Sequence, residues 1–148
     1  MHVCAKPILI TFYLLAFHSV ASGSGAQTIE GKLAHVRDAD TIELATSRGR
    51  IAIRLNGVDA PELDERGGRA GKRWMARAYG GQPLRCVLNG DKTYDRWVGV
   101  CYDRNGTDIG AATIAAGHAR DCPRFSGGRY RQFETEASRS IPSKPYCR

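Results

Sequence analysis

The sequence predicts a fold that is mainly β with helices (α+β): a five-stranded β-barrel with about three packed helices. Three observations predict it. Five short apolar runs are bounded by glycines or polar turns, helical patterns with recognisable ends follow the first three runs, and no internal repeat or low-complexity linker interrupts the chain. Short strands with interspersed helices are typical of a small barrel of the OB type.

The expected strands are apolar runs of β-forming residues. In the third run, Ile51, Ile53 and Leu55 alternate with Ala52 and Arg54, so opposite faces of the strand differ in polarity. The five runs are TIEGKLAHV (28–36), TIELA (41–45), RIAIRL (50–55), LRCVLNG (84–90) and WVGVCY (97–102). A turn at residues 47–49 joins the second run to the third.

Three helices are expected. The first covers residues 69–79, where Ala70, Trp74 and Ala78 recur at every fourth position and two glycines follow. The second begins after Asp108, a good N-cap residue, and ends at Gly117. The third extends from about residue 130 to 139.

The N-terminus predicts export. Lys6 precedes an apolar run from Ile8 to Phe17, and small residues near Ala21 or Ala26 offer cleavage sites. The run is about half of the ~20 residues that span a bilayer, so a retained anchor is the less favoured alternative. We therefore expect a signal peptide at residues 1–26 and one domain at residues 27–148, exported to a periplasm or to the medium.

The charge predicts an anionic partner. The formal net charge is +7, and it becomes +6 once Lys6 leaves with the signal peptide. Nucleic acid is favoured because aromatic residues lie among the basic ones, although lipid, acidic glycans or mere solubility would suit the same charge. The residues expected to bind the substrate are Lys92, Trp97, Arg124 and Phe125.

Four cysteines remain after the signal peptide, an even number that favours disulfides in an exported chain. Three pairings are possible. Cys86 and Cys101 lie in runs that resemble neighbouring antiparallel strands, and Cys147 can tie the tail to Cys122. We expect these two pairs. The alternative, a zinc site, is disfavoured by the cysteine spacing and by the scarcity of histidines.

Acidic residues follow two of the expected strands. Asp38 and Asp40 lie in the turn RDAD, and Asp59 lies in VDAPE after the third strand. Both loops can meet at one end of a barrel. Ala60 precedes a proline, which favours an extended backbone and leaves its carbonyl free to point outward. Carboxylates with a backbone carbonyl are the hard oxygen ligands of calcium, although ordinary turn and surface roles are the alternative for each residue.

These blocks resemble a known family. VRDADTIEL followed by IRLNGVDAPE closely resembles the staphylococcal nuclease (thermonuclease) family, in which a D-x-D-T turn is followed by R-L-x-x-[VI]-D-[TA]-P-E. YDRWVGVCY and GTDIGAATIAAGHA are similar to the family's later strand and helix. The resemblance implies an OB-fold barrel of five strands with three helices, and a calcium-dependent phosphodiesterase that acts on DNA and RNA.

The resemblance also implies roles for single residues. Asp40 and Asp59 match the calcium-ligating carboxylates, and the Ala60 carbonyl matches the backbone ligand. Asp38 and Thr41 match residues that lie behind these ligands. The family often has threonine at the position of Ala60, but only the main-chain oxygen ligates.

The catalytic residues carried over are Arg54, a phosphate-clamping arginine, and Glu62, the general base; the implied product keeps a 3′-phosphate. One position departs from the family. YDRWVGVCY lacks the glycine and arginine that supply the second clamp, so we expect Arg96 to take this role. Alternatively, Arg96 only contacts the substrate backbone, as Lys92 does in this hypothesis.

Two rival functions remain open. One is a binding module that kept the barrel but lost the catalytic residues. The presence of Asp40, Arg54, Asp59 and Glu62 disfavours it. The other is a histidine-pair ribonuclease, but His118 follows an apolar helix end and is expected to be packed. We expect DNA and RNA as partners, with single-stranded or frayed regions preferred, a monomer, and no membrane association after signal cleavage.

Overall fold

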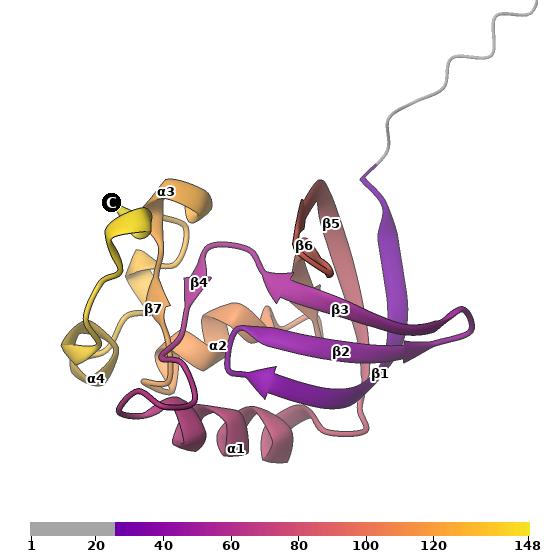
Figure 1. Ribbon diagram of the computed structural model, residues 1–148, viewed down its shortest axis with the longest axis horizontal. Helices are drawn as coiled ribbons and strands as arrows, with labels where there is room; N and C mark the ends of the chain where they lie inside the picture. Colours follow the sequence, from indigo (N-terminus) through magenta and orange to yellow (C-terminus); the bar gives the residue numbers. More distant parts are fainter. Residues whose placement is uncertain (1–25) are drawn as a thin grey trace, which may run out of the picture.

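The computed structural model describes residues 26–148, so nearly all of the expected signal peptide lies outside the described residues. Five strands form a closed barrel in the order β1-β2-β3-β6-β5, shown on the right of Figure 1. This confirms the expected α+β, OB-like fold. The barrel strands are β1 (Thr28–Asp38), β2 (Thr41–Thr46), β3 (Gly49–Leu55), β5 (Pro83–Thr93) and β6 (Arg96–Tyr102).

Two kinds of strand pairing close the barrel. β1, β2 and β3 form successive antiparallel pairs, and β5 pairs antiparallel with both β6 and β1. β3 and β6 pair in parallel, with Ile53 opposite Trp97. Because strand side chains alternate, Ile53 and Leu55 are buried in the core while Arg54, between them, lies on the other face.

The two longer helices form near their expected positions. α1 (Gly68–Tyr79) packs against β1. Its fully buried stripe contains Gly71, Met75 and Tyr79, one residue further along than the expected Ala70 stripe, whose members are only partly buried. α2 (Ile109–Ala115) begins as predicted, since the Asp108 carboxylate accepts hydrogen bonds from the backbone N–H groups of Gly110 and Ala111, at 2.9 and 3.2 Å.

The prediction of one continuous helix from about residue 130 to 139 is wrong, because two separate short elements form there. A 3₁₀ turn, η1 (Arg131–Phe133), ends before an extended Glu134, and a separate α4 (Glu136–Ser140) then begins. Thr135 is extended and caps α4 in a reciprocal capping box with Ser138, so the local hydrogen bonds favour a fresh helix start. Two further short elements are α3 (Pro123–Ser126) and η2 (Pro145–Cys147).

A small second sheet links the barrel to the C-terminal segments. β4 (Val58–Asp59) pairs antiparallel with β7 (Arg120–Asp121), so that Asp59 lies opposite Arg120. Figure 1 shows β4 between the barrel and the group formed by β7, α3 and α4. The sequence did not predict this ribbon. No helix within residues 26–148 is long and apolar enough to cross a membrane.

Both expected disulfides are confirmed. Cys86 and Cys101 face each other across β5 and β6, as the antiparallel register requires. Cys122, directly before α3, is joined to Cys147 in η2, which ties the C-terminal tail back to the fold.

Candidate active site

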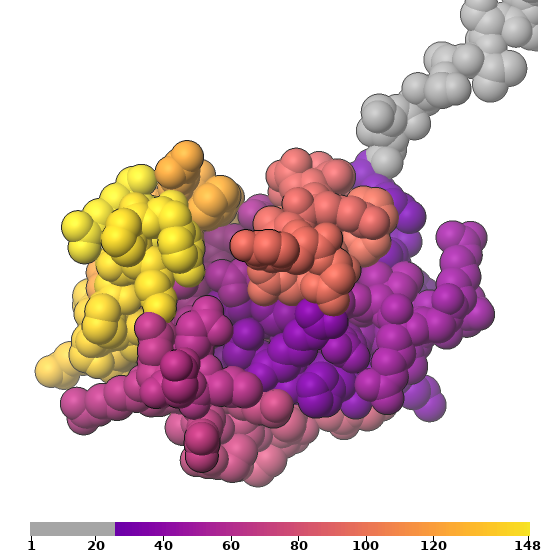
Figure 2. All heavy atoms as spheres, in the orientation of Figure 1, coloured from indigo at the N-terminus to yellow at the C-terminus, as the bar shows by residue number. Residues whose placement is uncertain are grey.

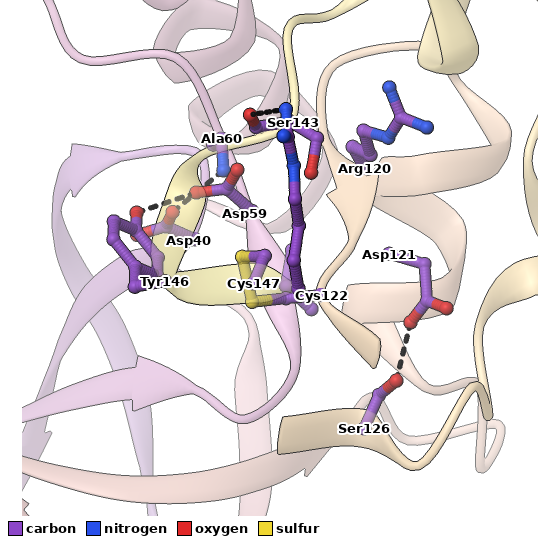
Figure 3. Close-up of a disulfide and its surroundings, with 12 residues drawn as sticks. Asp40, Asp59, Ala60, Arg120, Asp121, Cys122, Ser126, Ser143, Tyr146 and Cys147 are labelled. Carbon is purple, nitrogen blue, oxygen red and sulfur yellow. Dashed lines mark hydrogen bonds between the residues drawn. A yellow bond between two sulfur atoms is a disulfide. The ribbon is translucent and has the colours of Figure 1, made fainter. Parts of the chain in front are cut away.

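The two acidic loops meet at one end of the barrel, as expected. Asp40 ends the turn between β1 and β2, and Asp59 lies on β4. The backbone N–H of Ala60 donates to Asp40 Oδ2 at 2.8 Å, which fixes one loop against the other (Figure 3). Asp40 and Asp59 are buried, at 1% and 2% exposure. Buried carboxylates need partners, so the groups around each one define the site.

The Asp40 carboxylate has three partners in the part of the chain that the structure describes. Its carboxylate forms an ion pair with Arg54 Nη1, accepts from Thr41 Oγ1 at 2.9 Å and accepts from the Ala60 N–H. Arg54 also donates from Nη2 to the Val58 carbonyl at 3.2 Å. Arg54 thereby connects β3 with the start of β2 and with β4, which keeps its guanidinium at the barrel end.

Asp38 completes this charged group. Its Oδ1 accepts from the backbone N–H of Asp40 at 3.0 Å, an arrangement that shapes the RDAD turn. Burial raises the pKa of Asp38, and the nearby Arg54 opposes that rise. Burial likewise lowers the pKa of Arg54, and Asp38 opposes that fall. The two groups thus stabilise each other's charged form in a site that water reaches poorly.

Arg96 reaches the same place from β6, the strand next to β3 in the barrel. It lies at the start of β6, and its Nη1 donates to Thr41 Oγ1 at 3.1 Å. Thr41 is fully buried and lies between Arg96 and Asp40. Arg54 and Arg96 therefore approach two consecutive residues, Asp40 at the end of the turn and Thr41 at the start of β2. The structure brings Arg96 to the expected site, and its catalytic role stays a prediction.

Sequence reasoning missed Tyr146. Its hydroxyl donates to Asp59 Oδ1 at 2.8 Å, as Figure 3 shows. Burial raises the pKa of Tyr146 to about 12, and the hydrogen bond to Asp59 adds to the rise. Tyr146 therefore stays a neutral donor. The signal that could have found it is its place directly before Cys147, a residue whose disulfide was expected.

Glu62 lies in an exposed loop after Pro61. Within residues 26–148, no hydrogen bond holds its carboxylate. The expected role of Glu62 as general base stays a prediction.

The residues expected to bind substrate lie in two pairs. Lys92 Nζ lies 4.1 Å from the centre of the Trp97 ring on the β5–β6 hairpin, and the Arg124 guanidinium lies 5.8 Å from the centre of the Phe125 ring in α3. Figure 2 shows a hollow between this hairpin, in salmon, and the orange and yellow C-terminal segments. The two pairs thus belong to segments that border the hollow on opposite sides.

His118 belongs to the packing between elements. Its ring lies 5.4 Å from that of Trp74 in α1, and burial lowers its pKa. This contact agrees with the expectation of a packed histidine.

The carboxylates of Asp40 and Asp59 and the carbonyl of Ala60 are oxygen ligands of the type that a hard cation such as calcium prefers. Within residues 26–148, no group of three or more His, Cys, Asp or Glu side chains is gathered to hold a metal ion. Asp59 is buried beside Asp40. Among the described residues, the one hydrogen bond to its carboxylate comes from a neutral phenol, so the carboxylate keeps acceptor capacity. Asp40 is engaged by Arg54, so a cation there would compete with a guanidinium.

Comparison with known proteins places this chain in a family. The succinoglycan biosynthesis protein ExoI of Rhizobium meliloti (strain 1021) is 36% identical over 135 residues, which cover 84% of this chain and 68% of ExoI. The chain belongs to the ExoI family. Two other relatives of this ExoI-family protein are named uncharacterized endonucleases, from Escherichia coli O157:H7 and from Escherichia coli; each is 32% identical over 91 residues.

The matches to the two endonucleases are partial. Each covers 62% of this ExoI-family chain and 60% of the relative's own length. No protein-family model matches the chain. Membership of the thermonuclease family, which the motifs indicate, therefore stays a prediction.

Proposed function

We propose that this ExoI-family protein is a nuclease that hydrolyses phosphodiester bonds of DNA and RNA. The observation that carries the proposal is the approach of Arg54 and Arg96 to two adjacent residues, Asp40 and Thr41, beside the buried Asp59. Two cations near buried carboxylates suit a phosphate that must be held and neutralised during attack. The endonuclease names of two relatives support the same class of substrate.

The arginines bind the reacting phosphate in this proposal. A guanidinium offers paired N–H donors that match two phosphate oxygens. Within residues 26–148, the only partner of Arg96 Nη1 is the neutral Thr41 hydroxyl, so this nitrogen can turn to a phosphate at little electrostatic cost. Arg54 is held by Asp40 and the Val58 carbonyl, which orients the rest of its fork.

Glu62 acts as the general base. A bond forms between a water oxygen and phosphorus, and the water's proton passes to the Glu62 carboxylate. The bond between phosphorus and the 5′-oxygen breaks, and the leaving oxygen takes a proton from solvent. The products carry a 3′-phosphate and a 5′-hydroxyl. The exposed, unengaged carboxylate of Glu62 supports this role.

Calcium is the proposed cofactor, held by Asp40, Asp59 and the Ala60 carbonyl. When bound, it supplies a Lewis acid that polarises a phosphoryl oxygen. Asp38 shapes the turn that presents Asp40 through its bond to the Asp40 N–H. Thr41 links Asp40 to Arg96 through its hydroxyl.

The hollow in Figure 2 is the proposed path of the substrate strand. Lys92 with Trp97 and Arg124 with Phe125 supply charge for phosphates and ring faces for unpaired bases. This suits single-stranded or frayed substrates. We further propose that the protein is exported, because its two disulfides suit an oxidising compartment, and that it acts as a monomer.

Digestion of DNA and of RNA by the purified protein, with calcium and with a chelator, tests the proposal. We expect cleavage of both polymers only with calcium, and products that a 3′-phosphatase converts to 3′-hydroxyl ends. Intact polymers in calcium would contradict the nuclease assignment. Cleavage that survives chelation would contradict the metal-dependent mechanism.

A further inference from the structure

A closed ring of contacts connects Asp59 with the C-terminal tail. Asp59 pairs through its backbone with Arg120 on β7, and Cys122 follows two residues later. Cys122 is bonded to Cys147, and the residue before Cys147 is Tyr146. The Tyr146 hydroxyl returns to Asp59 at 2.8 Å (Figure 3). The disulfide thus links the segment that pairs with the Asp59 backbone to Tyr146, which hydrogen-bonds the Asp59 side chain.

Further bonds hold the tail on both sides of this ring. Lys144 Nζ forms an ion pair with Glu65, in the loop that follows β4. Arg120 Nη1 donates to the Ile141 carbonyl at 2.8 Å, where the tail leaves α4. Tyr146 itself is 44% exposed, so burial alone holds it weakly. Its position depends on these tethers.

We propose that Tyr146 is a positioning residue for Asp59, and that the Cys122–Cys147 disulfide is the tether that sets it in place. The inference rests on the proposed function, in which Asp59 is a calcium ligand. One carboxylate oxygen accepts the phenol hydroxyl, which fixes the rotation of the carboxylate and leaves its other oxygen for a cation. Donors that orient a ligating side chain in this way commonly change metal affinity about 10-fold to 100-fold.

The same geometry makes the site sensitive to thiol chemistry. Reduction of Cys122–Cys147 releases the segment around Cys147 from the start of α3. The local concentration of the Tyr146 hydroxyl at Asp59 then falls. Reduction of Cys86–Cys101, which joins two paired barrel strands, leaves the tail attached. The two disulfides should therefore differ in their effect on calcium binding.

Tyr146→Phe in the purified protein tests the positioning role, because it removes only the hydroxyl. By calorimetry, we expect its calcium dissociation constant to rise about 10-fold or more. At saturating calcium, kcat and the KM for nucleic acid should return to near wild-type values, which a general folding defect would not allow. Tyr102→Phe is the matched control: it removes a hydroxyl that bonds Arg129, and calcium affinity should stay unchanged.

The paired variant Cys122→Ser/Cys147→Ser should reproduce the loss of calcium affinity, while Cys86→Ser/Cys101→Ser should keep wild-type affinity at temperatures where it is folded. A calcium affinity of Tyr146→Phe within twofold of wild type overturns the inference and leaves the proposed nuclease standing. A wild-type protein that cleaves nucleic acid without binding calcium overturns both the inference and the proposed cofactor.

Discussion

Arg96 Nη1 lies 3.1 Å from the hydroxyl of Thr41, a residue 55 positions earlier in the chain. The parallel pairing of β3 with β6 makes this contact possible, because it brings the start of β6 beside the strand that pairs with β2. The Thr41 hydroxyl in turn donates to Asp40, so the contact joins Arg96 to the buried acid.

Arg96→Ala is expected to lower kcat by ~10²-fold or more with little change in KM, because a clamp on the transition state acts mainly on turnover. Steady-state kinetics on DNA and RNA check this. Arg85→Ala is the matched control, since that guanidinium stacks on Tyr102 elsewhere on the same strand pair. Near-normal kcat with weaker, less salt-sensitive binding would instead identify Arg96 as a peripheral phosphate contact.

Glu62→Gln is expected to keep the fold and calcium binding and to lose ~10²-fold to 10⁴-fold of activity, because an amide of the same size cannot accept the proton of water. Initial rates at neutral pH provide the measurement. Asp64→Asn, a neighbouring exposed change, should keep its activity. A loss smaller than about fivefold in Glu62→Gln would remove it from the role of base.

Asp59→Ala is expected to abolish calcium-dependent cleavage and to weaken calcium binding, since one of the two proposed carboxylate ligands is lost. Calorimetry gives the affinity, with Asp91→Ala as the control for removal of an exposed carboxylate. Unchanged calcium affinity in Asp59→Ala would count against the proposed metal site.

Loss of the Cys86–Cys101 disulfide is expected to lower the free energy of unfolding by about 3 kcal/mol, because the bond closes a loop with a sequence separation of 15 residues and restricts the unfolded chain. Denaturant unfolding of Cys86→Ser/Cys101→Ser measures the change. The initial rate at low temperature should stay near wild type. A large loss of rate in a fully folded sample would show that this disulfide does more than stabilise the barrel.

Local signals in the sequence predicted much of the fold. The alternation in RIAIRL predicted β3, and Asp108 predicted the start of α2, because each depends on neighbouring residues only. The pairing of Cys86 with Cys101 followed from two apolar runs that form an antiparallel pair. The meeting of the Asp40 and Asp59 loops at one barrel end was likewise expected.

Contacts between distant segments were harder to predict. The stripe on α1 was placed one residue early, since small alanines and Trp74 satisfy the same periodicity as Gly71 and Met75. The β4–β7 ribbon has only two residues in each strand, too few for a periodic signal. Tyr146 reaches Asp59 only through the combination of that ribbon with the Cys122–Cys147 disulfide.

The bond from Tyr146 to Asp59 also sets an order of assembly, because the two residues are 87 positions apart. All five barrel strands are complete by Tyr102, so an emerging chain can close its barrel while the tail is still missing. Long-range contacts of this kind form after local ones, since more chain entropy is lost in closing them. A protease that trims only the last few residues would therefore leave a folded barrel whose Asp59 carboxylate has lost its phenol partner.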